Sequence, residues 1–260
     1  MLTLFLPAFF TISILLARPF PLLRKSMRCL EMELSLKIIA RIRTDFPTKF
    51  GIPRQSGLVE SLKGMIVFEK EYQNPDALRG LEGFSHIWLI WQFSESMREN
   101  WSATVRPPRL GGNTRFGVFA TRSPFRPNPL GLSSVKLDRI ELASNLGPVL
   151  HVSGVDLMDN TPIYDIKPYL PYIDCHPEAI GGFADSFKDY TLEVEFPQQW
   201  LQLIPEDQRD TLLAVLANDP RPSYQNDPKR IYGFEFLTFD IRFTVKERVL
   251  SVCEVALNGQ

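Results

Sequence analysis

Residues 116–140 read Phe-Gly-Val-Phe-Ala-Thr-Arg-Ser-Pro-Phe-Arg-Pro-Asn-Pro-Leu-Gly-Leu-Ser-Ser-Val-Lys-Leu-Asp-Arg-Ile, and this stretch decides the expected fold class. An apolar run, 116–120, and an alternating run, 133–140, flank a loop that is too rich in proline to hold a helix. Strands joined by turns rather than by long helices are typical of antiparallel sheets. The stretch therefore predicts an antiparallel sheet or a small closed barrel.

Two arginines, Arg122 and Arg126, stand on the proline-rich loop of residues 119–132. Each proline of the loop fixes its own φ and restrains the residue before it, so the loop is stiff. Stiffness lowers the entropy cost of holding a guanidinium in place, and a guanidinium matches carboxylate or phosphate oxygens. We interpret the segment as an anion-binding loop. The alternative is a proline-rich connection whose arginines only interact with solvent.

The rest of the chain carries further strand patterns and one clear helix pattern. Strands are expected at 34–38, 65–68, 86–93, 147–157 and within 234–249, with a short helical segment at 74–81. A longer helix is expected from near Pro205 to near Asn218. We expect Trp88, Trp91 and His86 in the core. No strand is followed by Gly-x-Gly-x-x-Gly, which argues against a doubly wound nucleotide-binding fold.

Composition limits the class of protein. The 260 residues are 44% hydrophobic, enough for a substantial core, and the formal net charge is −1. The three cysteines, Cys29, Cys175 and Cys253, are far apart and show no zinc-ligand or disulfide spacing. We therefore expect no metal site, a reducing compartment and a cytoplasmic protein.

A local positive patch stands against this balanced background. Between residues 98 and 139 there are eight basic and two acidic residues. Such patches engage phosphate backbones, whereas the net charge of the whole chain would not attract nucleic acid. The alternative is that these arginines pair with acids from distant segments or line a solvated face.

The first 31 residues differ from the rest. The run from Leu2 to Leu16 is nearly all apolar, and its basic residues follow it. The run is short for a transmembrane helix, and its charge order is unlike that of a secretory signal. We interpret residues 1–31 as a leader or a mis-assigned start, with translation beginning at Met27 or Met32. A membrane anchor or an organelle-targeting segment is the alternative.

A second polar segment follows the strand pattern at 147–157. The sequence Asp159-Asn160-Thr161-Pro162 predicts a turn, in which Asn160 tolerates the left-handed region. The extended segment 165–172 then presents a carboxylate, an ammonium and phenols. These groups could form a functional site, or a structural turn with a satisfied salt bridge.

Five motifs, in order, resemble the TsaA-like (TrmO-like) family of tRNA methyltransferases. They are Lys49-Phe50-Gly51-Ile52-Pro53-Arg54-Gln55, Leu81-Glu82-Gly83-Phe84-Ser85-His86-Ile87-Trp88, Val105-Arg106-Pro107-Pro108-Arg109-Leu110-Gly111-Gly112, the loop 119–132, and Asp165 to Tyr172. The resemblance covers about residues 35–175 and continues more weakly through 218–224 and 239–242.

The resemblance implies a fold and an activity. It implies a mainly β protein, with an antiparallel β-barrel that is not a Rossmann-type methyltransferase domain, followed by a smaller α+β domain. We place the TsaA-like barrel at 32–180 and the C-terminal domain at 181–260. The implied enzyme is a homodimeric transferase that uses S-adenosylmethionine to methylate the N6 amine of threonylcarbamoyladenosine next to the tRNA anticodon.

The family motifs also imply site residues. The expected cofactor-binding residues are Pro53, Arg54, Gln55, Ser94, Glu95, Arg122, Leu132, Asp159, Asn160, Thr161 and Pro162. Two positions depart from the family pattern, which commonly has His-Gln at 94–95 and Gly at 160. Glu95 adds a carboxylate to that contact, whereas Asn160 can keep the turn.

The remaining site residues are expected to act on the substrate. Asp165 and Tyr169 are the candidate catalytic residues, with Asp165 as acceptor of the amine proton. The candidate RNA-binding residues are Arg106, Arg109, Arg126, Lys167 and Tyr172. The alternatives are a noncatalytic RNA-binding module and a methyltransferase of another small acceptor. We expect tRNA as partner and no membrane association.

Overall fold

A computed structural model describes residues 34–107, 110, 114–221 and 227–257. Two units are distinguished, residues 1–35 and 36–260, and everything below belongs to the second unless stated. The expected leader, residues 1–31, lies outside the described part of the chain.

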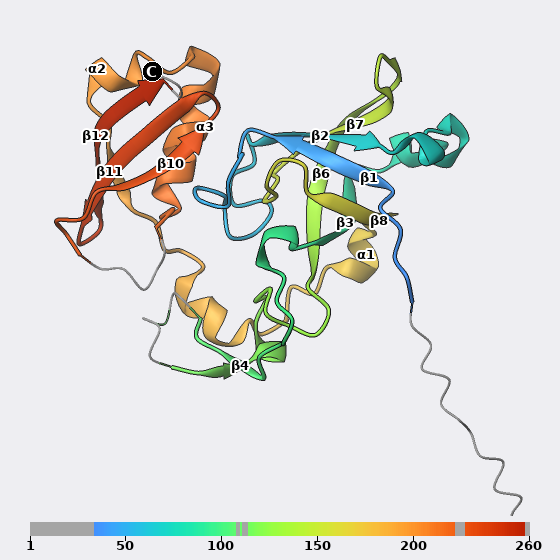
Figure 1. Ribbon diagram of the computed structural model, residues 1–260, viewed down its shortest axis with the longest axis horizontal. Helices are drawn as coiled ribbons and strands as arrows, with labels where there is room; N and C mark the ends of the chain where they lie inside the picture. The colour runs from blue at the N-terminus through green and yellow to red at the C-terminus, as the bar shows by residue number, and fades with distance from the viewer. Residues whose placement is uncertain (1–33, 108–109, 111–113, 222–226, 258–260) are drawn as a thin grey trace, which may run out of the picture. The chain divides into compact units, whose positions relative to one another are not determined.

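Six antiparallel strands form a closed barrel (Figure 1). Around the barrel the order is β1-β2-β7-β6-β3-β8, so the first and last strands in sequence pair with each other. The strands are β1 (Ala40–Thr44), β2 (Lys63–Phe68), β3 (His86–Gln92), β6 (Leu130–Ser144), β7 (Gly147–Ser153) and β8 (Pro162–Pro168). This confirms the expected antiparallel barrel.

The long strand β6 shows why the sequence folds in this way. It has 15 residues, and in its first half Gly131, Ser133, Val135 and Leu137 face inward. The residues between them face outward, which is the period of two that a half-buried strand requires. β6 pairs with β3 on one side and β7 on the other, so it connects the aromatic strand to the rest of the barrel.

One glycine of β6 is required by packing. A Cβ at Gly131 would lie 2.2 Å from the indole ring of Trp91, which is 7% exposed. The absence of a side chain at position 131 therefore lets the Trp91 ring lie flat against the neighbouring strand.

A second sheet follows the barrel in sequence. Its order is β10-β11-β12-β9, antiparallel except that β12 and β9 run parallel. The strands are β9 (Glu193–Glu195), β10 (Tyr232–Phe236), β11 (Phe239–Lys246) and β12 (Val249–Leu257), with helices α2 (Gln198–Leu201) and α3 (Glu206–Ala217) between β9 and β10. This arrangement confirms the expected smaller C-terminal α+β region.

Helix α3 confirms the expected helix from near Pro205 to near Asn218. Pro205 and Asn218 are its N-cap and C-cap residues, and Pro205 has an extended conformation that suits a helix start. Its buried face carries Leu212, Val215 and Leu216, spaced three and four apart as one side of a helix requires.

The remaining elements are short. They are β4 (Thr104–Val105) paired with β5 (Phe116–Gly117), α1 (Pro171–Asp174), and the 3-10 helices η1 (Lys70–Tyr72), η2 (Pro75–Leu78), η3 (Leu81–Gly83), η4 (Ser94–Ser96), η6 (Val118–Ala120) and η7 (Gly182–Phe187). None of the helices in the described ranges is both long and apolar enough to cross a membrane.

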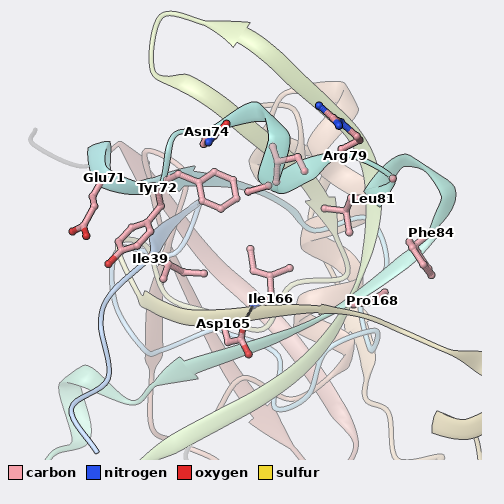
Figure 2. A pocket seen from close by; sticks show the side chains of 14 residues that line it. Ile39, Glu71, Tyr72, Asn74, Arg79, Leu81, Phe84, Asp165, Ile166 and Pro168 are labelled. Carbon is pink, nitrogen blue, oxygen red and sulfur yellow. Dashed lines mark hydrogen bonds between the residues drawn. The ribbon is translucent and has the colours of Figure 1, made fainter.

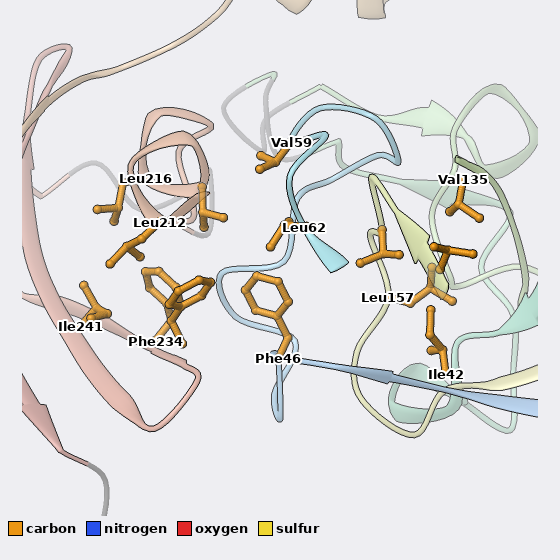
Figure 3. Packing of buried hydrophobic residues seen from close by; sticks show 14 of the residues in the cluster. Ile42, Phe46, Val59, Leu62, Val135, Leu157, Leu212, Leu216, Phe234 and Ile241 are labelled. Carbon is orange, nitrogen blue, oxygen red and sulfur yellow. The ribbon is translucent and has the colours of Figure 1, made fainter. Parts of the chain in front are cut away.

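A continuous apolar cluster joins barrel and C-terminal residues (Figure 3). Phe46, which follows β1, packs edge-on against Phe236 of β10 with ring centroids 6.0 Å apart. A polar contact accompanies it, since the Thr211 hydroxyl donates to Ser61 Oγ at 2.9 Å. Burial of large aromatic side chains at such a contact stabilises both partners.

Two local expectations were wrong, and a third was confirmed. Residues 34–38 form no strand, and Leu34 is 80% exposed, because β1 begins only at Ala40 where pairing to β2 and β8 starts. The pattern at 116–120 divides into the short strand β5 and the 3-10 helix η6. The short helical segment expected at 74–81 is confirmed as the 3-10 helix η2, which begins at Pro75 and is followed by Gly80 at φ 88°; a second 3-10 turn, η3, comes after the glycine.

The core position expected for His86 was also wrong, and the two tryptophans differ. His86 is the first residue of β3 and is exposed, because the alternation of the strand buries Ile87, Leu89 and Trp91 instead. Trp91 is in the core as expected, whereas Trp88 is only partly buried.

Candidate cofactor pocket

A cavity of about 580 Å³ opens on the barrel next to the end of β3. Its wall comes from four stretches distant in sequence: residues 52–55, β3 with 93–96, the loop 122–128 with the start of β6, and residues 156–161. Trp91, Phe93 and Leu132 give it apolar surface, and several charged side chains lie at its edge. A concave apolar cavity with a few polar groups is typical of a small-molecule site.

Arg122 and Gln55 meet in this wall. The Arg122 guanidinium donates to the Gln55 side-chain oxygen, and the Gln55 amide donates to the carbonyl of Arg54. Two segments separated by 67 residues are thereby joined at the cavity. The side chain of Arg54 in turn donates to the backbone carbonyl of Arg221 at 3.0 Å.

The proline-rich loop is held both by its own side chains and by neighbouring segments. Thr121 Oγ1 donates to the carbonyl of Val118 at 2.9 Å and accepts from the backbone N–H of Ser123 at 3.2 Å. The Arg126 guanidinium donates to the carbonyl of Thr121 at 3.1 Å, and the Arg98 guanidinium lies 3.7 Å from the Phe125 ring centroid. Backbone contacts to neighbouring segments add to these, since the N–H of Ser102 donates to the carbonyl of Phe125 at 3.3 Å and the N–H of Phe93 donates to the carbonyl of Pro129 at 3.0 Å.

The expected turn at Asp159–Pro162 is present, and Asn160 has φ 62°. The turn is bonded to β1 by two groups. Asp159 Oδ1 accepts from the backbone N–H of Thr44 at 3.1 Å, and the carbonyl of Asn160 accepts from the side chain of Arg41 at 3.2 Å. Thr161 is 3% exposed, donates to the carbonyl of Met158 at 2.7 Å, and lines the cavity. The turn therefore fixes one edge of the pocket to the barrel.

The cavity brings together most of the residues expected to bind the cofactor. Eight of the eleven line it: Pro53, Arg54, Gln55, Ser94, Glu95, Arg122, Leu132 and Thr161. The other three, Asp159, Asn160 and Pro162, are not in its wall but flank Thr161 in the turn.

The residues expected to bind RNA or to act in catalysis are more dispersed. Arg126 lines the cavity, Arg106 is exposed elsewhere, and Arg109 lies outside the described residues. Asp165 and Lys167 form an ion pair at 2.9 Å. Asp165 lies in the wall of a different cavity, of about 570 Å³, beneath the 3-10 turns that follow β2 (Figure 2).

The two tyrosines have different environments. Tyr169 is partly buried and packs against Trp88, with ring centroids 5.4 Å apart. Trp88 itself lines the cofactor cavity and donates its indole N–H to Asp174 Oδ2 at 2.9 Å. Tyr172, on α1, is 81% exposed and offers an open ring face.

The positive patch between residues 98 and 139 is largely unneutralised. Within its described residues, Arg139 alone has a carboxylate within 4 Å, that of Glu141 at 3.8 Å. Arg115 and Arg122 instead donate to neutral side chains, Thr104 and Gln55. The alternative of pairing with distant acids is therefore not what the described part of the patch shows.

Sequence reasoning missed one polar group of the cavity. Asp156 lines it, is partly buried, and accepts a hydrogen bond of 2.6 Å from Ser133 Oγ. Desolvation raises the pKa of Asp156 to about 6, against the lowering effect of Ser133, of two backbone N–H groups and of Arg122. The signal was a single carboxylate between the apolar residues Val155 and Leu157, which a strand interpretation of 147–157 passed over.

No cluster of metal-ligating side chains occurs in the part of the chain that the structure describes. The groups that face the cavity are guanidinium, amide, hydroxyl and carboxylate groups on an apolar wall. Such a set can bind an organic molecule with both apolar and charged parts.

Models of two protein domains match this chain. The model of the tRNA-methyltransferase O N-terminal domain matches residues 41–175, and the model of the TrmO C-terminal domain matches residues 189–258. A tRNA (adenine(37)-N6)-methyltransferase from Escherichia coli is 42% identical over 219 residues, which are 80% of this chain and 92% of the relative. A putative S-adenosylmethionine-dependent methyltransferase, RcsF, from Pseudomonas aeruginosa is 38% identical over 217 residues, 80% of this chain and 91% of the relative.

Solved structures agree with the sequence matches. A crystal structure of TrmO from Pseudomonas aeruginosa superimposes with a TM-score of 0.69 at 33% identity, and covers 87% of this chain and 98% of its own. Both domains of the family are matched, in order, on a barrel and a C-terminal sheet. The chain belongs to the TrmO family.

Proposed function

We propose that this protein is an S-adenosylmethionine-dependent methyltransferase that methylates the N6 amine of adenine 37 in tRNA. The single observation that carries the proposal is the cavity, which gathers eight of the eleven cofactor residues expected from the family motifs. The names of the relatives support the reaction, since the Escherichia coli protein is a tRNA (adenine(37)-N6)-methyltransferase.

The cavity fits the proposed cofactor in its chemistry. Trp91, Phe93 and Leu132 offer apolar surface for an adenine ring, while Arg122 and Gln55 offer polar contacts for a carboxylate or a hydroxyl. Arg54 is fixed at its far side by the carbonyl of Arg221, so its position in the wall is defined. When bound, S-adenosylmethionine would supply an electrophilic methyl group, and the protein's part is to position the acceptor nitrogen.

The acceptor that we propose is threonylcarbamoyladenosine, which carries a carboxylate. Arg126 lines the cavity and Arg106 is exposed, so both can contribute positive charge to a tRNA substrate. Arg guanidinium groups bind carboxylate and phosphate oxygens in two-pronged geometry. The unneutralised patch around them adds attraction for the phosphate backbone.

A methyl-transfer assay tests this proposal. Purified protein is incubated with labelled S-adenosylmethionine and with matched tRNAs that carry or lack the threonylcarbamoyl group. We expect label only in the modified tRNA, at adenine 37. Equal labelling of both tRNAs would contradict threonylcarbamoyladenosine as the acceptor. If the protein binds the cofactor but labels neither tRNA, the proposed methyl transfer to tRNA is contradicted.

A noncatalytic RNA-binding module is the second candidate, and the positive patch is the observation that favours it. Such a module would need no cofactor cavity. Calorimetry with S-adenosylmethionine alone separates the two, because only the enzyme is expected to bind it. A homodimer and a cytoplasmic location belong to the same proposal, and light scattering of the purified protein measures the first.

A further inference from the structure

A chain of hydrogen bonds behind the cavity fixes the orientation of Asp156. Trp91 Nε1 donates to Ser133 Oγ at 3.0 Å, and Ser133 Oγ donates to Asp156 Oδ1 at 2.6 Å. An indole N–H can only donate, so the hydroxyl of Ser133 must accept from it and direct its own proton to the carboxylate. Ser133 is 1% exposed and Trp91 7%, so the chain is held rigidly in the barrel wall.

The three residues of this chain come from separate elements. Trp91 is on β3, Ser133 is on β6, and Asp156 follows β7. The carboxylate reaches the cavity at the end of the chain, in the same wall as Gln55 and Arg122. A carboxylate with no role would be solvated at lower cost on the surface than in this wall.

Among the described residues that line the cavity, Asp156 is the one acid that is partly buried. The other charged side chains that line it are Lys49, Arg54, Glu95, Arg122 and Arg126, and Glu95 is exposed. Arg122 attracts the Asp156 carboxylate but already donates to Gln55. Burial outweighs these favourable contacts and raises the pKa of Asp156 to about 6, so its ionised form lacks a fully compensating partner.

We propose that Asp156 is a cofactor-binding residue whose carboxylate holds a cationic centre of S-adenosylmethionine. The inference rests on the proposed function and adds to it a residue outside the family motifs. The cofactor carries two cationic centres, a sulfonium and an ammonium, and either can be the partner of the carboxylate. S-adenosylhomocysteine keeps the ammonium but has a neutral sulfur, so it distinguishes the two.

Proton linkage is the first test, and it uses the unmodified protein. Because a bound cation favours the ionised carboxylate, binding near pH ~6 should release a proton from Asp156. Calorimetry in buffers of different ionisation enthalpy measures this release. The affinity for S-adenosylmethionine should fall by up to about tenfold per unit below pH ~6 and level off between pH ~6 and pH ~7, below the range near pH ~8 in which an α-amino group loses its proton. An affinity that is constant across this range would overturn the proposal.

Asp156→Asn is the second test, at pH ~7 where the Asp156 carboxylate is mostly ionised and the α-ammonium of the cofactor is mostly protonated. The variant should bind S-adenosylmethionine about tenfold or more weakly, and its proton release should be lost. The matched control is Asp45→Asn, since burial also raises the pKa of Asp45, with a contribution from Asp159, but Asp45 lies outside the cavity wall. The control should keep both the affinity and the proton release.

The product analogue then identifies the cationic centre. If the sulfonium is the partner, Asp156→Asn weakens S-adenosylmethionine but not S-adenosylhomocysteine. If the ammonium is the partner, both weaken equally. Each of these two results supports the proposal. The proposal is overturned if the variant binds each compound as tightly as the unmodified protein does. Absence of any binding to the unmodified protein would instead contradict the proposed function.

Discussion

Asn160 occupies a backbone position that requires a left-handed conformation. Its φ of 62° lies in the left-handed region, which most residues avoid and which asparagine and glycine adopt at low cost. The carbonyl of Asn160 accepts from Arg41, and its N–H donates to the carbonyl of Ile42. The turn that carries Thr161 into the cavity therefore depends on this conformation.

Substitutions at Asn160 should separate backbone from side-chain effects. Asn160→Gly keeps the left-handed conformation, and we expect the free energy of unfolding to change by about 0.5 kcal/mol or less. Asn160→Val forces a β-branched residue into the left-handed region and should lower the free energy of unfolding by about 1 to 2 kcal/mol. Urea denaturation measures both, and equal stabilities of the two variants would contradict this reading.

At the scale of elements, β3 and β6 act as one unit. The Trp91 ring of β3 lies over Gly131 of β6 and hydrogen-bonds to Ser133 two residues further along that strand. Both strands also contribute to the cavity wall. Packing inside the barrel therefore sets the shape of the pocket.

Gly131→Ala should disturb this unit. The new Cβ would lie 2.2 Å from the indole ring, so either strand or ring must shift, and we expect a loss of about 1 to 3 kcal/mol in the free energy of unfolding. Gly117→Ala is the matched control, because no atom lies within 4 Å of its Cβ position and its φ of −57° suits alanine. Equal thermal unfolding of the two variants would show that the ring moves freely.

The sequence was sufficient where local chemistry dictates the structure. The helix α3 follows from Pro205 and from the spacing of Leu212, Val215 and Leu216, and the turn at Asn160 follows from its residue types. It was insufficient where strand pairing decides. Residues 34–38 alternate like a strand but have no partner strand within the described part of the chain, and His86 is exposed because it begins β3 rather than occupying its middle.

The residues of the candidate site also divide into those that the sequence could predict and those that it could not. Eight cofactor residues carried over from family motifs meet in one cavity, although the segments that carry them lie up to about 100 residues apart. Asp156 could not be assigned from its neighbours, because its role depends on Ser133 and Trp91 from other strands. Asp165, chosen for its place in a polar segment, lines a different cavity because β8 directs it there.

At the scale of the whole molecule, the C-terminal region reaches the cofactor cavity through one turn. Asp219 and Arg221 form a two-pronged ion pair, at 2.8 and 2.9 Å, with side chains 9% and 7% exposed. The carbonyl of the same Arg221 accepts from Arg54 in the cavity wall. The buried pair thus sets the position of a cavity residue that lies 167 positions earlier in the chain.

Asp219→Asn should weaken both stability and cofactor binding. Removal of the Asp219 charge takes the carboxylate away from a buried guanidinium, at a cost of about 3 kcal/mol in the free energy of unfolding. The displaced Arg221 carbonyl should also raise the Kd for S-adenosylmethionine several-fold. Asp240→Asn is the control: Arg242 and Asp240 have the same spacing and a 2.9 Å contact, but their side chains are far less buried, 48% and 30% exposed.

One outcome would contradict the link between the Asp219–Arg221 ion pair and cofactor binding. If Asp219→Asn lowers the melting temperature but leaves the cofactor Kd equal to that of Asp240→Asn, the pair is structural only. Calorimetry well below the melting temperature of both variants makes this comparison.

The parallel pairing of β9 with β12 has a consequence for biosynthesis. β9 emerges from the ribosome more than fifty residues ahead of Val249, so its backbone groups stay without their sheet partner until the final nine-residue strand is released. The barrel can close earlier, once β8 is available to β1. A premature stop just before Val249 would therefore leave a completed barrel attached to the β10-β11 hairpin, with the β11 edge exposed and β9 unpaired, which is a target for proteolysis and for pairing with other chains.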